Sequence, residues 1–160
     1  MYIEFVEDVN LSTKKIKPRV RLIIIKNGKI LMSYVSDEKF YFFIGGKMEF
    51  GETLKQACER EIMEECKAKF NFKKILYVRD FIKPAENEHS LELFILGDID
   101  KFEEVEGFPD EEKNGINYQT WLDLEKLDSY DIRPKGIIKT LLEDYKNGFK
   151  NGALYIGEID

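Results

Sequence analysis

The stretch that decides the fold runs from Gly45 to Glu65 and reads GGKMEFGETLKQACEREIMEE. From Thr53 onward it has the pattern of an amphipathic helix that follows a glycine-containing turn. At about 100° per residue, Glu61 and Glu65 each lie within about 20° of the direction of Leu54. The same stripe carries small and apolar side chains, namely those of Leu54, Ala57, Cys58 and Ala68. The helical period therefore places two carboxylates inside the apolar face.

Carboxylates in such a position destabilise a fold unless they are paired or bind a metal ion. Glu61, Glu64 and Glu65 also lie within about one turn and repel one another. A divalent cation would relieve both costs, because Mg²⁺ prefers hard oxygen ligands. Glutamate is also common on the rims of ordinary amphipathic helices. Helix geometry alone leaves both interpretations open, a cation site and a charged rim.

The spacing of the stretch adds a second observation. Starting at Gly46, it reads Gly-x5-Glu-x7-Arg-Glu-Ile-x-Glu-Glu and ends at Glu65. This pattern resembles the signature of the Nudix hydrolases, Gly-x5-Glu-x7-Arg-Glu-(apolar)-x-Glu-Glu-x-Gly-(apolar). The matching positions are Gly46, Glu52, Arg60, Glu61, Ile62, Glu64 and Glu65. The resemblance implies an α/β fold, a Nudix-type α/β/α sandwich with a mixed β-sheet between helices.

The signature ends differently in this chain. The family's second glycine is replaced by Lys67, and the final apolar position is Ala68. Glycine stops a helix easily because it adopts the left-handed conformation at the C-terminal cap. Lysine resists that conformation, so we expect the helix to continue beyond Lys67 toward Asn71, the next residue that tolerates it.

The resemblance also implies an activity and its residues. The activity is metal-dependent hydrolysis of a pyrophosphate bond in a nucleoside diphosphate derivative, with Mg²⁺ or Mn²⁺ as the cofactor. Such ions neutralise phosphate oxygens and lower the pKa of water. The implied metal ligands are the Gly46 carbonyl, Glu61, Glu64 and Glu65. The implied catalytic residues are Glu52, Arg60, Glu61 and Glu64. Glu61 is either a ligand or the base that activates water, and we expect Arg60 and Glu52 to pair or to orient Glu61.

Other residues have two interpretations each. Some family members take a base from a later loop, where Glu86, Glu88, Glu111 and Glu112 are the candidates, although a solvated loop charge fits each better. A contact with phosphate or base is one interpretation of His89, and a strand-end histidine is the other. Tyr34, Phe40, Tyr41 and Phe42 either stack on a base or pack in the core. The acidic segment 101–115 is a candidate specificity loop.

The remaining chain predicts strands and one further helix. Asn27-Gly28 indicates a hairpin between two apolar runs. Further strands are expected at 40–46, 72–83, 89–99 and 116–124, with a helix over 133–148 and a tail that either adds a strand or lies on the surface. No repeat or linker interrupts this order, so we expect a single domain over residues 1–160.

Composition limits the partners. The chain has 160 residues, a net charge of −6 and 43% hydrophobic residues, which is typical of a soluble globular protein. The negative charge argues against broad nucleic-acid binding, so the expected partner is a small nucleotide-type substrate, with a homodimer left open. The basic segment 14–21, KKIKPRVR, is interpreted as a solvated edge strand in preference to a phosphate site. No signal peptide or membrane span is recognisable, and Cys58 and Cys66 do not have metal-ligand spacing, so we expect a cytoplasmic protein.

Three alternatives to the hydrolase have specific weaknesses. A non-catalytic Nudix domain that senses a nucleotide would not need the whole acidic cluster. A prenyl diphosphate isomerase on a similar fold needs an acid pair that usually includes a cysteine in a strand, where neither Cys58 nor Cys66 is expected. A plain structural domain would need the signature to be a coincidence. We find no motif that selects one nucleotide derivative.

Overall fold

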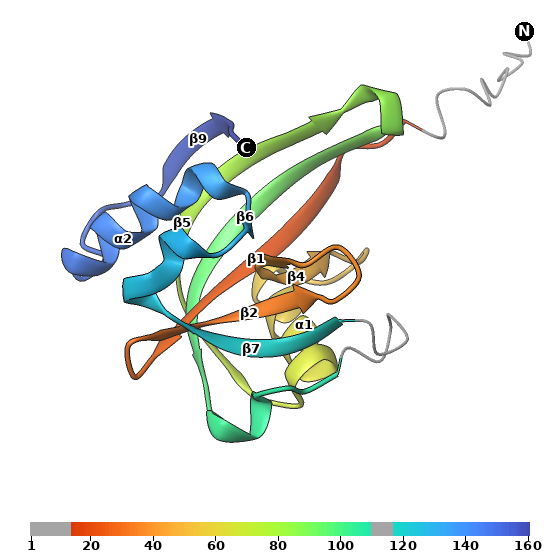
Figure 1. Ribbon diagram of the computed structural model, residues 1–160. Coiled ribbons are helices and arrows are strands. Elements are labelled where there is room, and N and C mark those ends of the chain that lie inside the picture. Colours follow the sequence, from red (N-terminus) through yellow and green to blue (C-terminus); the bar gives the residue numbers. More distant parts are fainter. Residues whose placement is uncertain (1–13, 110–116) are drawn as a thin grey trace, which may run out of the picture.

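A curled mixed β-sheet lies between two α-helices in the computed structural model, which describes residues 14–109 and 117–160 (Figure 1). The helices are α1 (Leu54–Cys66) and α2 (Ile138–Lys146). The strands are β1 (Lys17–Lys26), β2 (Lys29–Val35), β3 (Phe40–Phe42), β4 (Ile44–Lys47), β5 (Phe70–Lys83), β6 (Glu88–Ile99), β7 (Asn117–Asp123), β8 (Ile132–Arg133) and β9 (Leu154–Glu158). Short 3₁₀ turns are η1 (Pro84–Glu86), η2 (Glu103–Val105), η4 (Leu124–Ser129) and η5 (Lys135–Ile137).

Strand β1 joins the two halves of the sheet. The strand order is β8-β3-β2-β1-β6-β5-β9, with β4 beside β1 and β7 beside β2. Residues 17–24 of β1 pair in parallel with β6, and residues 19–22 pair antiparallel with β4. The expected hairpin at Asn27-Gly28 then leads into β2, with Ile25 opposite Ile30. β1 is therefore an interior strand with partners along both edges.

This position shows that the interpretation of segment 14–21 as a solvated edge strand is wrong. Within β1, Val20 and Leu22 are fully buried, while Arg19 and Arg21 alternate with them on the other face. Local composition favoured an edge because lysines and arginines commonly protect edges. The deciding partner, β6, lies about 70 residues further along the chain, where local composition carries no information about pairing.

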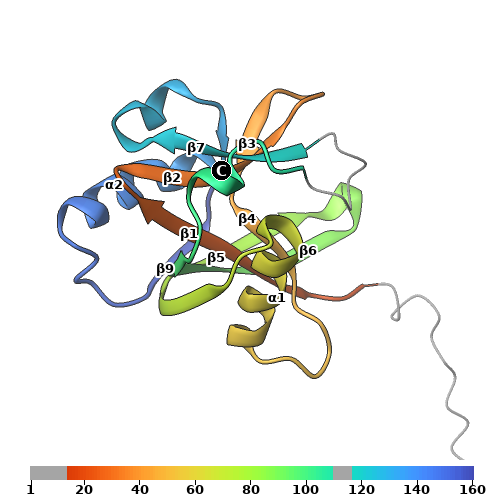
Figure 2. The ribbon, with the colours of Figure 1, turned by 90° about the horizontal axis from the view of Figure 1, so that it is seen from below.

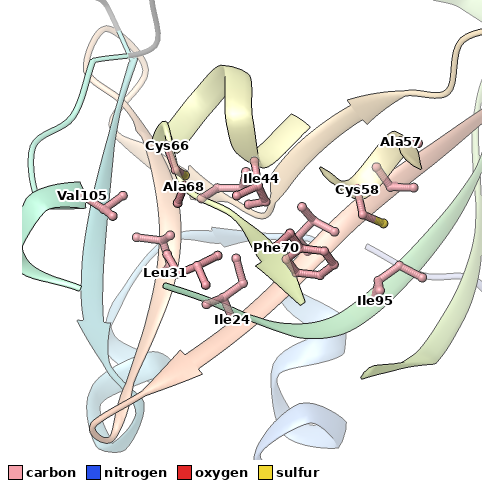
Figure 3. Packing of buried hydrophobic residues seen from close by; sticks show 14 of the residues in the cluster. Ile24, Leu31, Ile44, Ala57, Cys58, Cys66, Ala68, Phe70, Ile95 and Val105 are labelled. Carbon is pink, nitrogen blue, oxygen red and sulfur yellow. The ribbon is translucent and has the colours of Figure 1, made fainter. Parts of the chain in front are cut away.

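The core has two halves on opposite faces of β1. Val20, Leu22 and Ile24 pack with the buried side of α1, in the cluster drawn in Figure 3. Ile23 packs in the second cluster, which includes Ile138 and other residues of the α2 region. Because neighbouring residues of a strand point to opposite faces, the two helices cover opposite sides of the sheet (Figures 1 and 2). The predicted α/β/α sandwich is confirmed.

Helix α1 begins at Leu54, in agreement with the expected start near Thr53, but ends earlier than expected. The Thr53 hydroxyl accepts a hydrogen bond from the Gln56 amide at 3.2 Å, and the Gln56 side chain accepts from the Thr53 amide at 2.8 Å. The expected continuation past Lys67 is wrong, because Lys67 itself adopts the left-handed conformation, with φ 50° and ψ 37°.

The reason is tertiary. The turn at Lys67 brings Ala68 to 1% exposure and Phe70 to 7% exposure in the α1 core cluster. A left-handed residue other than glycine costs about 1–2 kcal/mol. Burial of a phenylalanine side chain alone contributes about 1.5–3 kcal/mol. Core burial therefore outweighs the backbone cost.

Two further expectations need correction: the single strand expected at 40–46 is divided at Phe43 into β3, which pairs with β2 and β8, and β4, which pairs with β1, and the helix expected over 133–148 is shortened to α2. The expected later strands are present within the described ranges. β5 and β6 form an antiparallel pair joined at η1, β7 occupies most of the predicted late strand, and α2 follows Pro134. The tail contributes β9, which pairs in parallel with β5. Cys58 and Cys66 are buried and form no disulfide within the described residues, and burial raises the pKa of the Cys58 thiol to about 12. No helix in the described parts of the chain is long and apolar enough to cross a membrane.

Candidate active site

The three carboxylates of helix α1 differ in how deeply they are buried. Glu61 and Glu65 are each 7% exposed and share the buried face of the helix with Ala57 and Cys58. The side chain of Glu64 is 37% exposed. The predicted placement of two carboxylates inside the apolar stripe is confirmed.

Strand β4 receives these two buried carboxylates. A Cβ atom on Gly46 would lie 2.6 Å from Glu61 Oε1, closer than non-bonded atoms approach. The amide of Gly45 donates a hydrogen bond to Glu65 Oε2 at 3.2 Å. Gly45 also has φ +143°, and a Cβ atom there would lie 2.0 Å from the Val20 carbonyl oxygen. The two glycines thus allow the helix carboxylates to lie directly on the strand backbone.

The Arg60 guanidinium connects three of the signature glutamates. It donates to Glu52 through Nε at 3.0 Å and through Nη2 at 2.7 Å. Its Nη1 donates to Glu61 Oε1 at 2.9 Å and to Glu64 Oε2 at 3.2 Å. The expected Arg60–Glu52 pair is present, and the same side chain also contacts Glu61.

The same arginine fixes the loop before the helix. Arg60 Nη2 donates to the Lys47 carbonyl at 2.9 Å, and the Glu49 amide donates to Glu52 Oε1 at 2.6 Å. The hydrogen bonds from Arg60 hold the pKa of Glu52 below its usual value. Conversely, the Glu52 carboxylate raises the pKa of Arg60, so both groups stay charged at neutral pH. The loop 47–52 is therefore tied to α1 by charge-assisted bonds.

One wall of a cavity of about 1470 Å³ is lined by Gly45, Gly46, Arg60, Glu61, Glu64 and Glu65. A second wall comes from the sheet face of β1, β5 and β6, with Arg19, Arg21, Arg79, Lys83, Glu88 and Glu92. A third wall comes from β3 and β8 and includes Phe40, Phe42 and Arg133. The Arg133 guanidinium lies 3.9 Å from the centre of the Phe40 ring, a cation–π contact.

Four residues of the second and third walls were not predicted from the sequence, namely Arg79, Lys83, Glu92 and Arg133. Glu92 is 2% exposed and Arg79 is 5% exposed, and both point into the cavity. The alternation of cationic residues with apolar ones along β1 was the available signal for Arg19 and Arg21. No comparable local signal marks Arg79, which enters the site only because β5 pairs with β6.

Of the two candidate loop bases that the structure describes, Glu88 lines the cavity and Glu86 does not. Glu86 does not line the cavity, and its carboxylate lies 3.6 Å from Lys83 Nζ. Glu88 lines the cavity, but hydrogen bonds from Ser90 and Lys17 and the charge of Arg19 lower its pKa to about 2. Such a carboxylate is a weak base at neutral pH. Glu111 and Glu112 lie outside the described residues.

The other candidates for substrate contact fall into two groups, those that line the cavity and those that do not. Phe40 and Phe42 line the cavity, whereas Tyr34 and Tyr41 do not and instead contact each other at 4.7 Å between ring centres. His89 does not line the cavity. In the segment 101–115, the part up to residue 109 does not line the cavity either, and Phe102, Val105 and Phe108 belong to the α1 core cluster or pack against it. The rest of that segment, 110–115, lies outside the described residues.

The chemistry of the α1 wall fits a hard divalent cation. Its donors are carboxylate oxygens, two of them from nearly buried side chains, and such oxygens are the ligands that Mg²⁺ prefers. As the side chains stand, the described residues include no group of three or more acidic, histidine or cysteine side chains arranged to hold a metal ion. The Arg60 guanidinium is the cation that contacts Glu61 and Glu64 in this arrangement.

Known structures share this architecture. A NUDIX hydrolase from Nitrosomonas europaea aligns with a TM-score of 0.65 at 21% identity, over 84% of this chain and 90% of that one. A UDP-X diphosphatase aligns with a TM-score of 0.66 at 17% identity, over 92% and 74% of the two chains. An ADP-ribose pyrophosphatase from Streptococcus suis aligns with a TM-score of 0.60 at 16% identity, over 91% and 100%.

Sequence comparisons give the family. A search of curated protein sequences found no match to the chain. The family model for the NUDIX domain matches residues 15–141, which include the whole signature and every strand from β1 to β8. The chain therefore belongs to the Nudix family of hydrolases.

Proposed function

We propose that this Nudix hydrolase cleaves a pyrophosphate bond in a nucleoside diphosphate derivative and depends on Mg²⁺ or Mn²⁺. The observation that carries the proposal is the charge arrangement at α1. Two nearly buried carboxylates and a third, partly exposed one face a cavity, and a single arginine contacts Glu52, Glu61 and Glu64. The cavity volume, about 1470 Å³, is ample for a nucleotide-sized ligand.

The roles follow from the donors present. Glu61, Glu64, Glu65 and the Gly46 carbonyl would hold the cation, which would neutralise phosphate oxygens and lower the pKa of the attacking water. Arg60 and Glu52 act as positioning residues, because their hydrogen bonds fix Glu61 and the loop 47–52. Glu61 either binds the cation or takes a proton from the attacking water.

The substrate is a small nucleotide-type molecule in this proposal. The aligned UDP-X diphosphatase and ADP-ribose pyrophosphatase act on different compounds by their names, and their identities to this chain are 17% and 16%. Neither name therefore selects the substrate here. Buried cysteines that form no disulfide within the described residues fit a reducing compartment, so the proposal places the enzyme in the cytoplasm, as a monomer or a homodimer.

A hydrolysis panel tests the function. It covers nucleoside triphosphates, oxidised nucleotides, ADP-ribose, nucleotide sugars and dinucleoside polyphosphates, each with Mg²⁺, with Mn²⁺ and with chelator. The variant is Glu64→Gln, and the matched control is Glu59→Gln, which makes the same change on the exposed side of the same helix. We expect metal-dependent turnover that falls at least about 100-fold in Glu64→Gln, more than the loss typical of a residue that only supports a ligand. Glu59→Gln should retain wild-type turnover.

Three outcomes would overturn the proposal. Turnover that survives Glu64→Gln, or that needs no divalent ion, would remove the carboxylate cluster from the chemistry. Absence of turnover on every compound, together with tight binding of one of them, would instead indicate a sensing domain.

A further inference from the structure

The sheet wall of the cavity has more positive than negative charge. Four cationic side chains from β1 and β5 surround two carboxylates of β6. Lys17 and Arg19 each lie 3.1 Å from the Glu88 carboxylate. On Glu92, Arg21 lies at 3.0 Å and Arg79 at 2.6 Å. We call the six residues of this sheet face that line the cavity, Arg19, Arg21, Arg79, Lys83, Glu88 and Glu92, the basic wall; Lys17 does not line the cavity. The basic wall has a surplus of two positive charges in a chain whose net charge is −6.

The strand register explains why these side chains meet. Arg19 pairs with Glu92 across β1 and β6, and Arg79 pairs with Glu92 across β5 and β6. Residues two apart on a strand share a face. The three strands therefore present a central acidic row flanked by two basic rows. Packing alone would not require this arrangement, because apolar residues at the same positions would extend the core.

Partial burial strengthens the attraction of the basic wall for an anion. Glu92 is 2% exposed and Arg79 is 5% exposed, so the inner pairs are largely removed from water. Burial tends to raise the pKa of Glu92, but the charges of Arg21 and Arg79 outweigh it and keep the group ionised. Charges within low-dielectric walls attract a counter-ion more strongly than charges on an open surface. Arginine forks also match phosphate geometry.

The basic wall is continuous with the acidic α1 wall. Arg21 is opposite Gly45 in the β1–β4 register, and Gly45 donates its amide to Glu65. From β4 to β5 there are three steps between neighbouring strands, or about 14 Å at roughly 4.8 Å per step. A ligand held at the α1 carboxylates can therefore extend across the arginines without leaving the cavity.

The chain itself supplies one oxygen acceptor to this wall and one acidic residue to the same cavity. Arg79 Nε donates to the Ile159 carbonyl at 2.7 Å, and Asp160 lines the same cavity. Arg79 thus binds an oxygen acceptor beyond the two carboxylates of the wall, and counting the Asp160 carboxylate leaves the sheet side of the cavity a surplus of one positive charge.

We propose that the basic wall binds a phosphate of the substrate other than the pair joined by the hydrolysed bond. The preferred substrates would then carry a further phosphate, as nucleoside triphosphates and dinucleoside polyphosphates do, and would not end in an uncharged sugar. This inference rests on the proposed function for the hydrolysed bond, but the charge surplus exists independently of it.

Binding of inorganic tripolyphosphate tests the wall without turnover. The titration is done by calorimetry with chelator present, so that no divalent ion contributes. The variants are Arg19→Gln and Arg21→Gln, whose side chains line the cavity and are 22% and 18% exposed; each leaves its glutamate one other cationic partner. The matched control is Lys26→Gln, on the same strand, 30% exposed, and outside the cavity. We expect the two variants to weaken binding about tenfold each and the control to change it less than twofold.

The substrate preference is read from a matched pair of substrates. We would compare kcat/KM for a nucleoside triphosphate and for a nucleotide sugar with the same base. The wild-type ratio should favour the triphosphate and fall about tenfold in Arg19→Gln, while Lys26→Gln preserves it.

The outcomes separate this inference from the proposed function. If tripolyphosphate does not bind, or if all three variants weaken it equally, the basic wall is not a phosphate site. If hydrolysis is absent but metal-free binding depends on Arg19, the wall stands and the hydrolase proposal fails. If hydrolysis occurs but the ratio of kcat/KM for the triphosphate to kcat/KM for the nucleotide sugar is the same in wild type and Arg19→Gln, the proposed hydrolase activity is supported and the proposed substrate preference is wrong.

Discussion

Gly46 and Glu61 are in such close contact that a larger residue at position 46 would displace the Glu61 carboxylate. A Cβ atom there would lie 2.6 Å from Glu61 Oε1 and 2.9 Å from its carboxyl carbon. The Glu61 carboxylate therefore fills the space that a side chain at position 46 would need. The Arg60 guanidinium holds the same carboxylate at 2.9 Å. Glu61 is thus fixed between the backbone of β4 and a charged partner on its own helix.

Gly46→Ala should displace the Glu61 carboxylate and reduce kcat/KM by about 100-fold, since a shift near 1 Å in a catalytic group has about that effect. Gly152→Ala is the matched control, because a Cβ there meets nothing within 4 Å and the backbone has no positive φ. Steady-state kinetics on the substrate found by the panel would measure both. Equal activity in the two variants would show that the close contact does not matter.

Mg²⁺ or Mn²⁺ should raise the melting temperature, because the ion binds only the folded arrangement of Glu61, Glu64 and Glu65. At 100 times its Kd, one bound ion stabilises by about 2.7 kcal/mol, which corresponds to a rise of several degrees for a chain of this length. Differential scanning fluorimetry would measure the shift. Glu64→Gln should abolish it and Glu59→Gln should retain it. A shift of equal size in all three proteins would place the ion elsewhere.

Arg60→Lys should lower kcat/KM even though the charge is retained. Lysine cannot reproduce the paired hydrogen bonds to Glu52 or reach Glu61, Glu64 and the Lys47 carbonyl together. The double variant with Glu52→Gln should lose less than the sum of the single losses in free energy, because both changes break one network. Additive losses would mean that the two residues act separately.

Glu88 should make stability depend on acid pH. Its pKa is lowered to about 2 in the folded protein, so its stabilisation is complete above the ordinary carboxyl pKa of 4.5. That stabilisation is lost as the pH falls from 4.5 through about 2. Glu88→Gln should therefore be less stable than wild type at pH 7, with a gap that closes toward pH 2. Urea unfolding at several pH values would measure it, with Glu59→Gln as control. A constant gap would contradict the lowered pKa.

Lys67→Gly should stabilise the protein by up to about 1 kcal/mol. The backbone at Lys67 has φ 50°, which costs about 1–2 kcal/mol for a residue with a side chain. Glycine also raises the conformational entropy of the unfolded chain, and this cancels part of the gain in stability. Lys69→Gly makes the same change two residues on, where φ is not positive, and should not stabilise. Denaturant unfolding compares the two, and a loss of stability in Lys67→Gly would mean that its side-chain contacts outweigh the backbone strain.

The local parts of the site could be predicted from the sequence. The helical period put Glu61 and Glu65 on the face of Ala57 and Cys58, and both carboxylates are nearly buried there. The Arg60–Glu52 pair, the hairpin at Asn27-Gly28 and the start of α1 at the Thr53 cap are also present. Each depends on residues within about two helical turns or one tight turn, so the local backbone geometry decides it.

Only the tertiary structure decided where β1 lies and where α1 ends. β1 pairs with β6, about 70 residues away, so the arginines that looked like protection for an edge face the cavity instead. Lys67 adopts a conformation that its own side chain disfavours, because the turn buries Ala68 and Phe70 in the core. The spacing of residues along the chain determined the acidic half of the site. The basic half was determined by strand pairing and core burial, because their free energies depend on residues that lie far apart in the sequence.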